Sequence, residues 1–577
     1  MIKRKRPKLY PHVIPDIKEW PIYKLHQDRR NFIREIDEFT LERLLKKYGG
    51  RISDLIAKTI YLEQIRIKEE PWKVDPPDER QFWKKVQNRL IVKSLDREEE
   101  EARATNEMLL RRILHRYSEE IVGTFSIKTF RFARRFLTFF FKRLLNAAAS
   151  RNFRRLYTSR HQLYERLVAR GELDTVRSLI NKGTVVVLPT HFSNLDSILV
   201  GYVMDEVLGL PSFSYGAGLN LYNTGYTAYF MNRLGAYRVD RRKKNPIYLE
   251  VLKSMSNLSL QRGTNSLFFP GGTRSRSGSL ETHLKMGLLG TVVEAQRAMY
   301  ESGKDQKIFI VPVVLGYHVV LEARYLIDQH LRRTGKERYF RQRDFGFSIR
   351  KILKFAWKVF SQPSEITLAF GKPLDVLGNF VDENGVSHDS KGQVVEVKDY
   401  FLSAEGVEAD LQREAEYTKI LADRVVERYF RENVVLSSHL VAFAAFNLLR
   451  IQNPSLDLYA VLRLPTDDHF FTREDMETAI SHLQAELKQR EERGEIRLAK
   501  QISWEPAELI RDGLKHLGVY HPAKVLKINK EGHFVSEDFH LLYFYHNRLD
   551  HYELEKVMQA PVPMVDPHWN NIDEIID

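Results

Sequence analysis

The sequence contains no cysteine among its 577 residues. Disulfide bonds, thiolate metal ligands and a cysteine nucleophile are therefore excluded from the protein's chemistry. No uncharged apolar run reaches the roughly 20 residues that a membrane-spanning helix needs. The basic start of the chain is followed by no apolar segment of the kind found in secretory signals. We therefore expect an intracellular protein that attaches to a membrane, if at all, without crossing it.

Positive charge is in excess. Lys and Arg number 90 against 76 for Asp and Glu, which gives a formal net charge of +14. This balance favours anionic partners such as nucleic acid, acidic lipid surfaces or phosphorylated substrates. With 43% hydrophobic residues, the chain is apolar enough to fold and long enough to form two or three units.

Acidic residues are missing from residues 121–164, although this stretch holds ten basic ones. Phenylalanines are interleaved with them, and helical spacing places Phe132, Phe136 and Phe139 together on one face. This pattern is typical of a helix at an anionic membrane surface, where rings enter the acyl boundary and cations meet headgroups. The alternative is a helix packed on a core with extended Arg side chains. No nucleic-acid-binding motif accompanies the charge, so we expect membrane contact and no nucleic acid.

Strand and helix patterns alternate in residues 165–400. Predicted strands cover residues 184–188, 265–269, 308–315 and 366–370, and predicted helices cover 196–208, 245–262 and 284–302. The alternation predicts an α/β fold in which helices cover a largely parallel sheet. We expect an exposed loop at 378–392 and helical regions at 1–120 and 401–577. The apolar run 434–449 is short for a membrane span and predicts a buried or interfacial helix.

His191 and Asp196 follow the first predicted strand, at the point where α/β folds place their chemistry. His191 is the one side chain in this loop that can take a proton near neutral pH. Asp196 lies about one helical turn further on, from where it can hold the imidazole in one tautomer. The pair predicts a general base, although a His and an Asp five residues apart are weak evidence alone.

Two basic blocks lie further along the chain. The block 234–244 includes Arg238 and Arg241. The block 268–278 directly follows a predicted strand, and its glycines let backbone amides approach an anion while its side chains add donors: Gly271, Gly272, Thr273, Arg274, Ser275 and Arg276. Together with His191, the blocks predict a site that activates a hydroxyl beside a phosphate. A Walker loop, H-E-x-x-H and G-x-S-x-G are all missing, which argues against nucleotide binding and the matching hydrolases.

The order of these blocks resembles the glycerolipid acyltransferase superfamily. H-x4-D at 191–196 is followed by G-A-x-x-V-x-R at 235–241, F-P-x-G-T-R-S-R-S-G at 269–278 and V-P-V at 311–313. The resemblance covers residues 170–375. The segment P-T-H-F-S-N-L-D-S, with Lys285 and Gly287, looks more like the glycerol-3-phosphate acyltransferases, whereas Val239-Asp240-Arg241 is closer to the lysophosphatidate enzymes.

The resemblance implies that His191, oriented by Asp196, is the base for direct acyl transfer from acyl-CoA or acyl carrier protein to glycerol 3-phosphate. Arg238, Arg241, Arg274, Ser275 and Arg276 would hold the acceptor phosphate and position its hydroxyl. Gly272, Thr273 and Lys285 complete the predicted set of substrate-binding residues. No metal or cofactor is implied. The protein would act in phospholipid biosynthesis as a peripheral or monotopic protein on the cytoplasmic face of a membrane.

One position departs from the family pattern. Gly271 stands where the family has Glu, a residue that the resemblance implies helps to bind or position the acceptor. Either another carboxylate replaces it or the choice of acceptor differs. Alternative acceptors are lysophosphatidate and dihydroxyacetone phosphate. Two non-enzymatic alternatives are a catalytically degenerate membrane-binding protein and a basic nucleic-acid binder.

Overall fold

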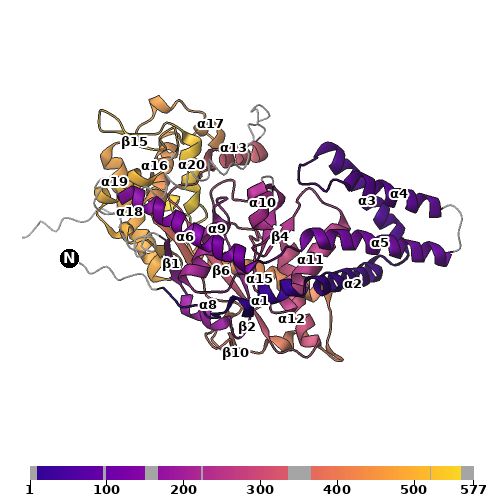
Figure 1. Ribbon diagram of the computed structural model, residues 1–577. Helices are drawn as coiled ribbons and strands as arrows, with labels where there is room; N and C mark the ends of the chain where they lie inside the picture. The colour runs from indigo at the N-terminus through magenta and orange to yellow at the C-terminus, as the bar shows by residue number, and fades with distance from the viewer. Residues whose placement is uncertain are drawn as a thin grey trace, which may run out of the picture. The chain divides into compact units, whose positions relative to one another are not determined.

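The computed structural model describes residues 9–94, 99–149, 167–222, 225–335, 365–519 and 521–559 (Figure 1). The chain divides into two compact units. The first comprises Met1–Val434 with Glu495–Arg497, and the second comprises Val435–Gly494 with Leu498–Asp577. The candidate site residues all belong to the first unit.

A seven-stranded sheet forms the centre of the first unit, in the order β1-β7-β6-β2-β5-β3-β4. The strands β2, β3, β4, β5 and β6 are mutually parallel, and β7 pairs antiparallel with β6. Every residue of β2 is buried, as expected for a strand covered on both faces. The strand bounds are β1 Leu167–Gly171, β2 Gly183–Pro189, β3 Ser214–Gly218, β4 Ala236–Val239, β5 Ser266–Leu267, β6 Lys307–Gly316 and β7 Ile366–Phe370.

The predicted α/β class and all four predicted strands are confirmed, but three strands of the seven-stranded sheet, β1, β3 and β4, were missed. Strand β3 reads S-Y-G-A-G, and its two glycines give it a weak strand signal. Strand β4 has only four residues, half of them partly exposed. The predicted loop 378–392 instead contributes to a small three-stranded antiparallel sheet of β8 (Phe380–Val381), β9 (Ser387–His388) and β10 (Val394–Val395). Short strands between turns carry too few residues for a period-two pattern to be recognised.

Helices surround the sheet. The predicted helix 196–208 is α9 (Asp196–Tyr202) continued by a π-helical turn over Val203–Val207. The helices α11 (Pro246–Gln261) and α12 (Met286–Glu301) pack against each other, and α15 (Leu411–Glu432) packs on α12 and β6. Three further helices of this unit are α8 (Leu173–Leu179), α10 (Gly225–Met231) and α13 (Ala323–Thr334).

The N-terminal helices add a second apolar layer to α11. The helices α2 and α5 pack together and on α11, and α3 joins them through α4 and α5 (Figure 1). Their shared core includes Phe32, Trp83 and Tyr117, all nearly inaccessible to solvent. The bounds are α1 Pro21–Gln27, α2 Arg29–Tyr48, α3 Ile52–Glu69, α4 Glu79–Ser94 and α5 Glu99–Ile121.

Helix α6 (Ile127–Ala149) lies within the basic, phenylalanine-rich segment 121–164. Residues 150–164 of this segment are outside the described part of the chain. One face is tied to the unit, because Arg134 donates to both carboxylate oxygens of Asp205 and Thr138 bonds to Tyr202. The opposite face is open. Phe132, Phe136 and Phe139 are 57%, 48% and 64% exposed there, an unusual display of large apolar side chains.

The second unit is helical. Its elements are α16 (Ser437–Gln452), α17 (Leu458–Leu462), α18 (Arg473–Glu492), α19 (Pro506–His516), α20 (Phe539–His546) and α21 (Glu555–Gln559). The apolar run at 434–449 forms most of α16, which is buried against α18, α19 and α20. Among the described helices, none is both long and apolar enough to cross a bilayer.

Candidate active site

His191 and Asp196 lie in direct contact at the end of β2. The strand stops at Pro189, and α9 begins at Asp196 itself, so a six-residue turn connects them. The His191 Nδ1 atom lies 2.8 Å from Asp196 Oδ2. Because a carboxylate can only accept, Nδ1 carries the proton and Nε2 is left as the proton-accepting nitrogen.

Asp196 is a buried carboxylate that accepts hydrogen bonds from its own loop and from Tyr317. The backbone N–H groups of Phe192 and Ser193 donate to Oδ2 at 2.6 and 2.8 Å, and the Tyr317 hydroxyl donates to Oδ1 at 2.6 Å. The Asp196 side chain is 0% exposed, whereas His191 is 15% exposed. The acid is thus fixed inside the protein while the imidazole can be reached from outside, as a general base requires.

The main chain of His191 is held on both sides. Its N–H donates to Glu281 Oε1 at 3.0 Å, and its carbonyl accepts from the Ser275 N–H at 2.7 Å. Its ring stacks on Phe269, with centroids 4.2 Å apart. These contacts join the His191 loop to the glycine-rich block after β5, which pairs directly with β2.

Three arginines gather beside this loop. The pKa of Arg241 is lowered by the protein atoms around its guanidinium and then by Arg274 and Arg276. The pKa of Arg276 is likewise lowered by desolvation, by Arg333 and by Arg274. Solvent still reaches the Arg241 side chain. Cations that destabilise one another at an accessible position form a site ready for an anion.

Within the described residues, only one arginine of this cluster forms an ion pair with a carboxylate. Arg274 forms an ion pair with Glu322, Nη1 to Oε1, at 2.9 Å. Glu322 is nearly inaccessible and its pKa is raised by burial, against the lowering effect of Arg274. Its other oxygen accepts from Ser193 Oγ at 3.4 Å, which links the cluster to the His191 loop.

The other basic residues of the block 234–244 have separate partners. Arg238 donates to the Asn232 side-chain oxygen and stacks over Tyr222. Arg242 binds Asp240 and Asp75, and the buried Lys243 binds Glu120. The structure therefore brings Arg241, Arg274 and Arg276 together and keeps Arg238 with neutral partners.

The glycine-rich block forms a tight turn. Gly272 has a φ of 72°, which favours glycine. A Cβ atom at Gly272 would lie 2.8 Å from Lys285 Nζ, so the Lys285 amine stands directly over this peptide. The Ser275 hydroxyl donates to the Ser279 carbonyl, which shapes the loop, while Thr273 lies partly exposed within it.

Three site residues escaped the sequence analysis. Tyr317 directly follows β6, the strand that contains V-P-V, and this position at a strand end was the available signal. Glu322 and Glu281 lie in loops with no pattern of their own. Both reach the site only through folding, since Glu322 and Ser193 are 129 residues apart.

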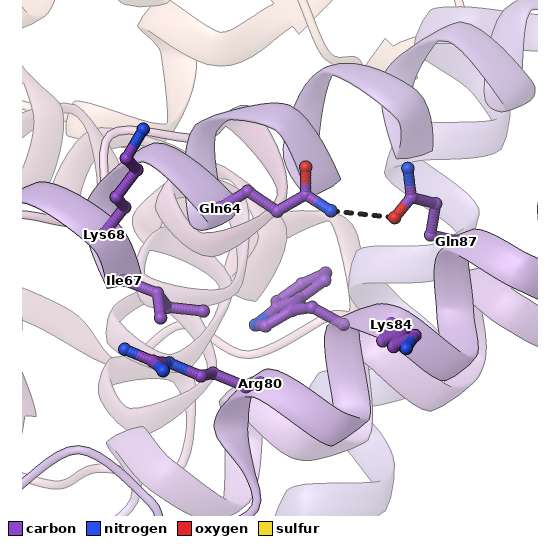
Figure 2. A pocket seen from close by; sticks show the side chains of 7 residues that line it. Gln64, Ile67, Lys68, Arg80, Lys84 and Gln87 are labelled. Atoms are coloured by element: carbon purple, nitrogen blue, oxygen red, sulfur yellow. Dashed lines mark hydrogen bonds between the residues drawn. The ribbon is translucent and has the colours of Figure 1, made fainter.

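A surface pocket of about 480 Å³ lies elsewhere, between α3 and α4 (Figure 2). It contains none of the sequence-predicted site residues. Gln64 and Gln87 bond across it, and its rim carries three cations: Lys68, Arg80 and Lys84. No group of three or more His, Cys, Asp or Glu side chains in the described ranges is arranged to hold a metal ion.

Comparison with known proteins agrees with this geometry. Residues 170–316 match the family model described as Acyltransferase, so this part of the chain is an acyltransferase domain. The range includes β2, the His191 loop and both basic blocks. Several curated relatives of the chain are named glycerol-3-phosphate acyltransferase.

Among these relatives is the glycerol-3-phosphate acyltransferase of Aeromonas hydrophila, 25% identical over 361 residues, which are 62% of this chain and 40% of that protein. The protein of the same name from Pseudomonas aeruginosa is 25% identical over 295 residues, 51% of this chain and 31% of that one. A Pseudoalteromonas translucida protein of that name aligns at 25% over 62% of this chain and 40% of its own length. The chain thus matches two fifths or less of each relative.

Proposed function

We propose that the chain is an O-acyltransferase that moves a fatty acyl group from acyl-CoA or acyl carrier protein to a hydroxyl of glycerol 3-phosphate. The observation that carries this proposal is the juxtaposition of a His–Asp pair and an arginine cluster of which only Arg274 is paired with a described carboxylate. The printed names of the relatives support the choice of glycerol 3-phosphate.

The reaction needs only a base and a phosphate clamp. His191 Nε2 accepts the proton of the acceptor hydroxyl as its oxygen attacks the thioester carbonyl, which forms a tetrahedral intermediate. Collapse of this intermediate breaks the C–S bond, and the imidazolium returns its proton to the departing thiolate. Asp196 stabilises the transient imidazolium and keeps the ring oriented. The atoms balance without a cofactor, because the acyl thioester is itself a substrate.

The arginine cluster would bind the acceptor phosphate. Arg241, Arg274 and Arg276 present planar forks to an anion, and its binding would relieve their mutual repulsion. The Lys285 amine over Gly272 adds a fourth cation from the next loop. Thr273 and Ser275 would shape and line the turn. Arg238, which bonds to Asn232, would be a further phosphate contact.

Helix α6 would bring the site to lipid. Its exposed Phe132, Phe136 and Phe139 face suits the acyl boundary of an anionic membrane, and Arg131 and Arg135 are exposed on the same helix. We infer peripheral attachment on the cytoplasmic face. Replacing the three phenylalanines by serine should abolish flotation with phosphatidylglycerol-containing vesicles while leaving the fold intact. Unchanged flotation would contradict a membrane role for this face.

The activity is tested by thiol release from acyl-CoA and acyl carrier protein with three acceptors: glycerol 3-phosphate, lysophosphatidate and dihydroxyacetone phosphate. Glycerol 3-phosphate should be preferred, and His191→Ala should lower kcat by about 10³-fold, within the range for loss of a general base. Tyr61→Phe, which changes an exposed side chain on α3, serves as the matched control. A His191→Ala variant that keeps more than a few per cent of activity would show that His191 is not the base.

The Val239-Asp240-Arg241 sequence favours lysophosphatidate as the second candidate acceptor. Its preference over glycerol 3-phosphate in the same assay would reassign the acceptor and leave the chemistry in place. Vesicle binding without turnover on any acceptor would instead support a degenerate membrane-binding protein.

A further inference from the structure

The space around residue 271 explains why a glycine occupies this position. Its φ does not fall in the left-handed region that Gly272 occupies, so its backbone would accept any residue. The space beside Gly271, in contrast, has no room for a side chain. A Cβ atom at Gly271 would lie 3.0 Å from Glu281 Cγ and 3.3 Å from Glu281 Oε1. Glu281 therefore already fills the volume into which a side chain at residue 271 would extend.

Glu281 also touches the catalytic loop. Its Oε1 accepts the His191 backbone N–H at 3.0 Å, so one carboxylate contacts both the His191 loop and the Gly271 turn. The half-buried position favours a strong hydrogen bond to this charged acceptor. The Lys285 N–H donates to the Pro270 carbonyl at 2.8 Å, which closes the loop that carries Glu281 back onto the turn.

We propose that Glu281 is a positioning residue for His191, and that it supplies from residue 281 the carboxylate which related enzymes carry at the position of Gly271. The proposal rests on the proposed acyl transfer for its kinetic readout. Glu281 fixes the His191 peptide, Asp196 fixes the ring, and the imidazole is thereby aimed at the acceptor hydroxyl. Gly271 and Glu281 form one unit, in which the absence of one side chain makes room for the other.

A carboxylate exchange between the two positions tests this unit. Glu281→Ala should lower kcat about 30-fold, because the loss of one charge-assisted hydrogen bond loosens the base. Glu281→Gln, which can still accept the N–H, should lose about fivefold. Gly271→Glu alone should also be impaired, since two carboxylates would compete for one volume. The double variant Gly271→Glu/Glu281→Ala should recover to within about fivefold of wild type, as expected for strongly coupled neighbours.

Thr282→Ala, an exposed neighbour in the same loop, is the control and should leave kcat and KM unchanged. Wild-type kcat in Glu281→Ala, or a double variant no better than Glu281→Ala, would overturn the proposal. Hydrogen exchange at the His191 amide provides a readout without turnover. It should accelerate in Glu281→Ala and be restored in the double variant.

The two readouts separate the possible failures. If wild type transfers acyl groups to no acceptor but the His191 amide behaves as described, the proposed function fails while the carboxylate exchange stands. An amide unaffected by Glu281→Ala would overturn the exchange itself.

Discussion

Arg241 and Arg242 are neighbours in sequence with opposite surroundings. Arg242 bonds to Asp240 at 2.7 Å and Asp75 at 2.5 Å, and its guanidinium stacks over Trp72. Its pKa is raised by these carboxylates, although desolvation opposes them. Desolvation lowers the pKa of Arg241, Arg274 and Arg276 lower it further, and no described carboxylate forms an ion pair with this side chain.

The difference shows how one basic block serves two purposes. Arg242 joins the N-terminal helical layer to the end of β4, because Asp75 lies in the turn before α4. Arg241 turns to the other side, toward the block after β5. A fully paired cation holds the structure together, whereas an uncompensated one creates a demand for an anion. Substitutions of Arg242 and of Arg241 should therefore affect different properties, the stability of the fold in one case and anion binding in the other.

The largest effect should come from Arg242→Met. Removal of the guanidinium leaves the buried Asp240 carboxylate without its main cation, which typically costs about 3–5 kcal/mol. We expect a marked fall in the free energy of unfolding by urea titration. Lys244→Met, at an exposed site two residues further on, is the control and should lie close to wild type. An unchanged free energy of unfolding in Arg242→Met would contradict the stabilising role of Arg242.

Arg241→Met should show the reverse pattern. The KM for glycerol 3-phosphate should rise about 30-fold, in line with loss of a charge-assisted contact to phosphate. Unfolding free energy should be unchanged or slightly higher, because a repelled cation is removed. Arg241→Lys should recover only part of the affinity, since an ammonium lacks the planar fork. If Arg241→Met is destabilised and its KM is unaltered, Arg241 does not bind the acceptor phosphate.

Sequence reasoning found the parts of the site that local pattern determines. The buried strand, the turn and the short helix place His191 and Asp196 within five residues, so their contact needs no distant partner. Arg241 and Arg242 could not be told apart in this way. Their difference depends on Asp75, 167 residues from Arg242, and on the pairing of β4 with β3 and of β3 with β5.

Glu281, Tyr317 and Glu322 were missed for the same physical reason. Each bonds to the His191 loop or to Asp196 from a segment that follows a strand beside β2, so the order of strands in the sheet decides the contact. The glycine at 271 was noticed as a missing carboxylate, but the residue beside it could only be seen in three dimensions.

The smallest effect should come from Glu322, the one carboxylate paired with the cluster among the described residues. Glu322→Gln frees Arg274, so we expect sulfate to bind about five times more tightly, close to 1 kcal/mol. Sulfate is a suitable probe because its charge is constant at neutral and mildly acidic pH. Binding is measured by calorimetry, with Arg241→Met as the variant that should bind weakly.

The pH dependence of sulfate binding tests whether the Glu322 carboxylate competes with the anion for Arg274. Burial raises the pKa of Glu322, partly offset by Arg274 and reinforced by Asp196. As pH falls through this pKa, the carboxyl group becomes neutral and stops competing for Arg274, so sulfate should bind more tightly in wild type. Glu322→Gln should lose this dependence. His330, whose pKa is lowered from the ordinary histidine value by burial and by Arg276, is present in both proteins. Equal slopes in the two proteins would therefore assign the pH dependence to His330 and leave Glu322 with a purely structural role.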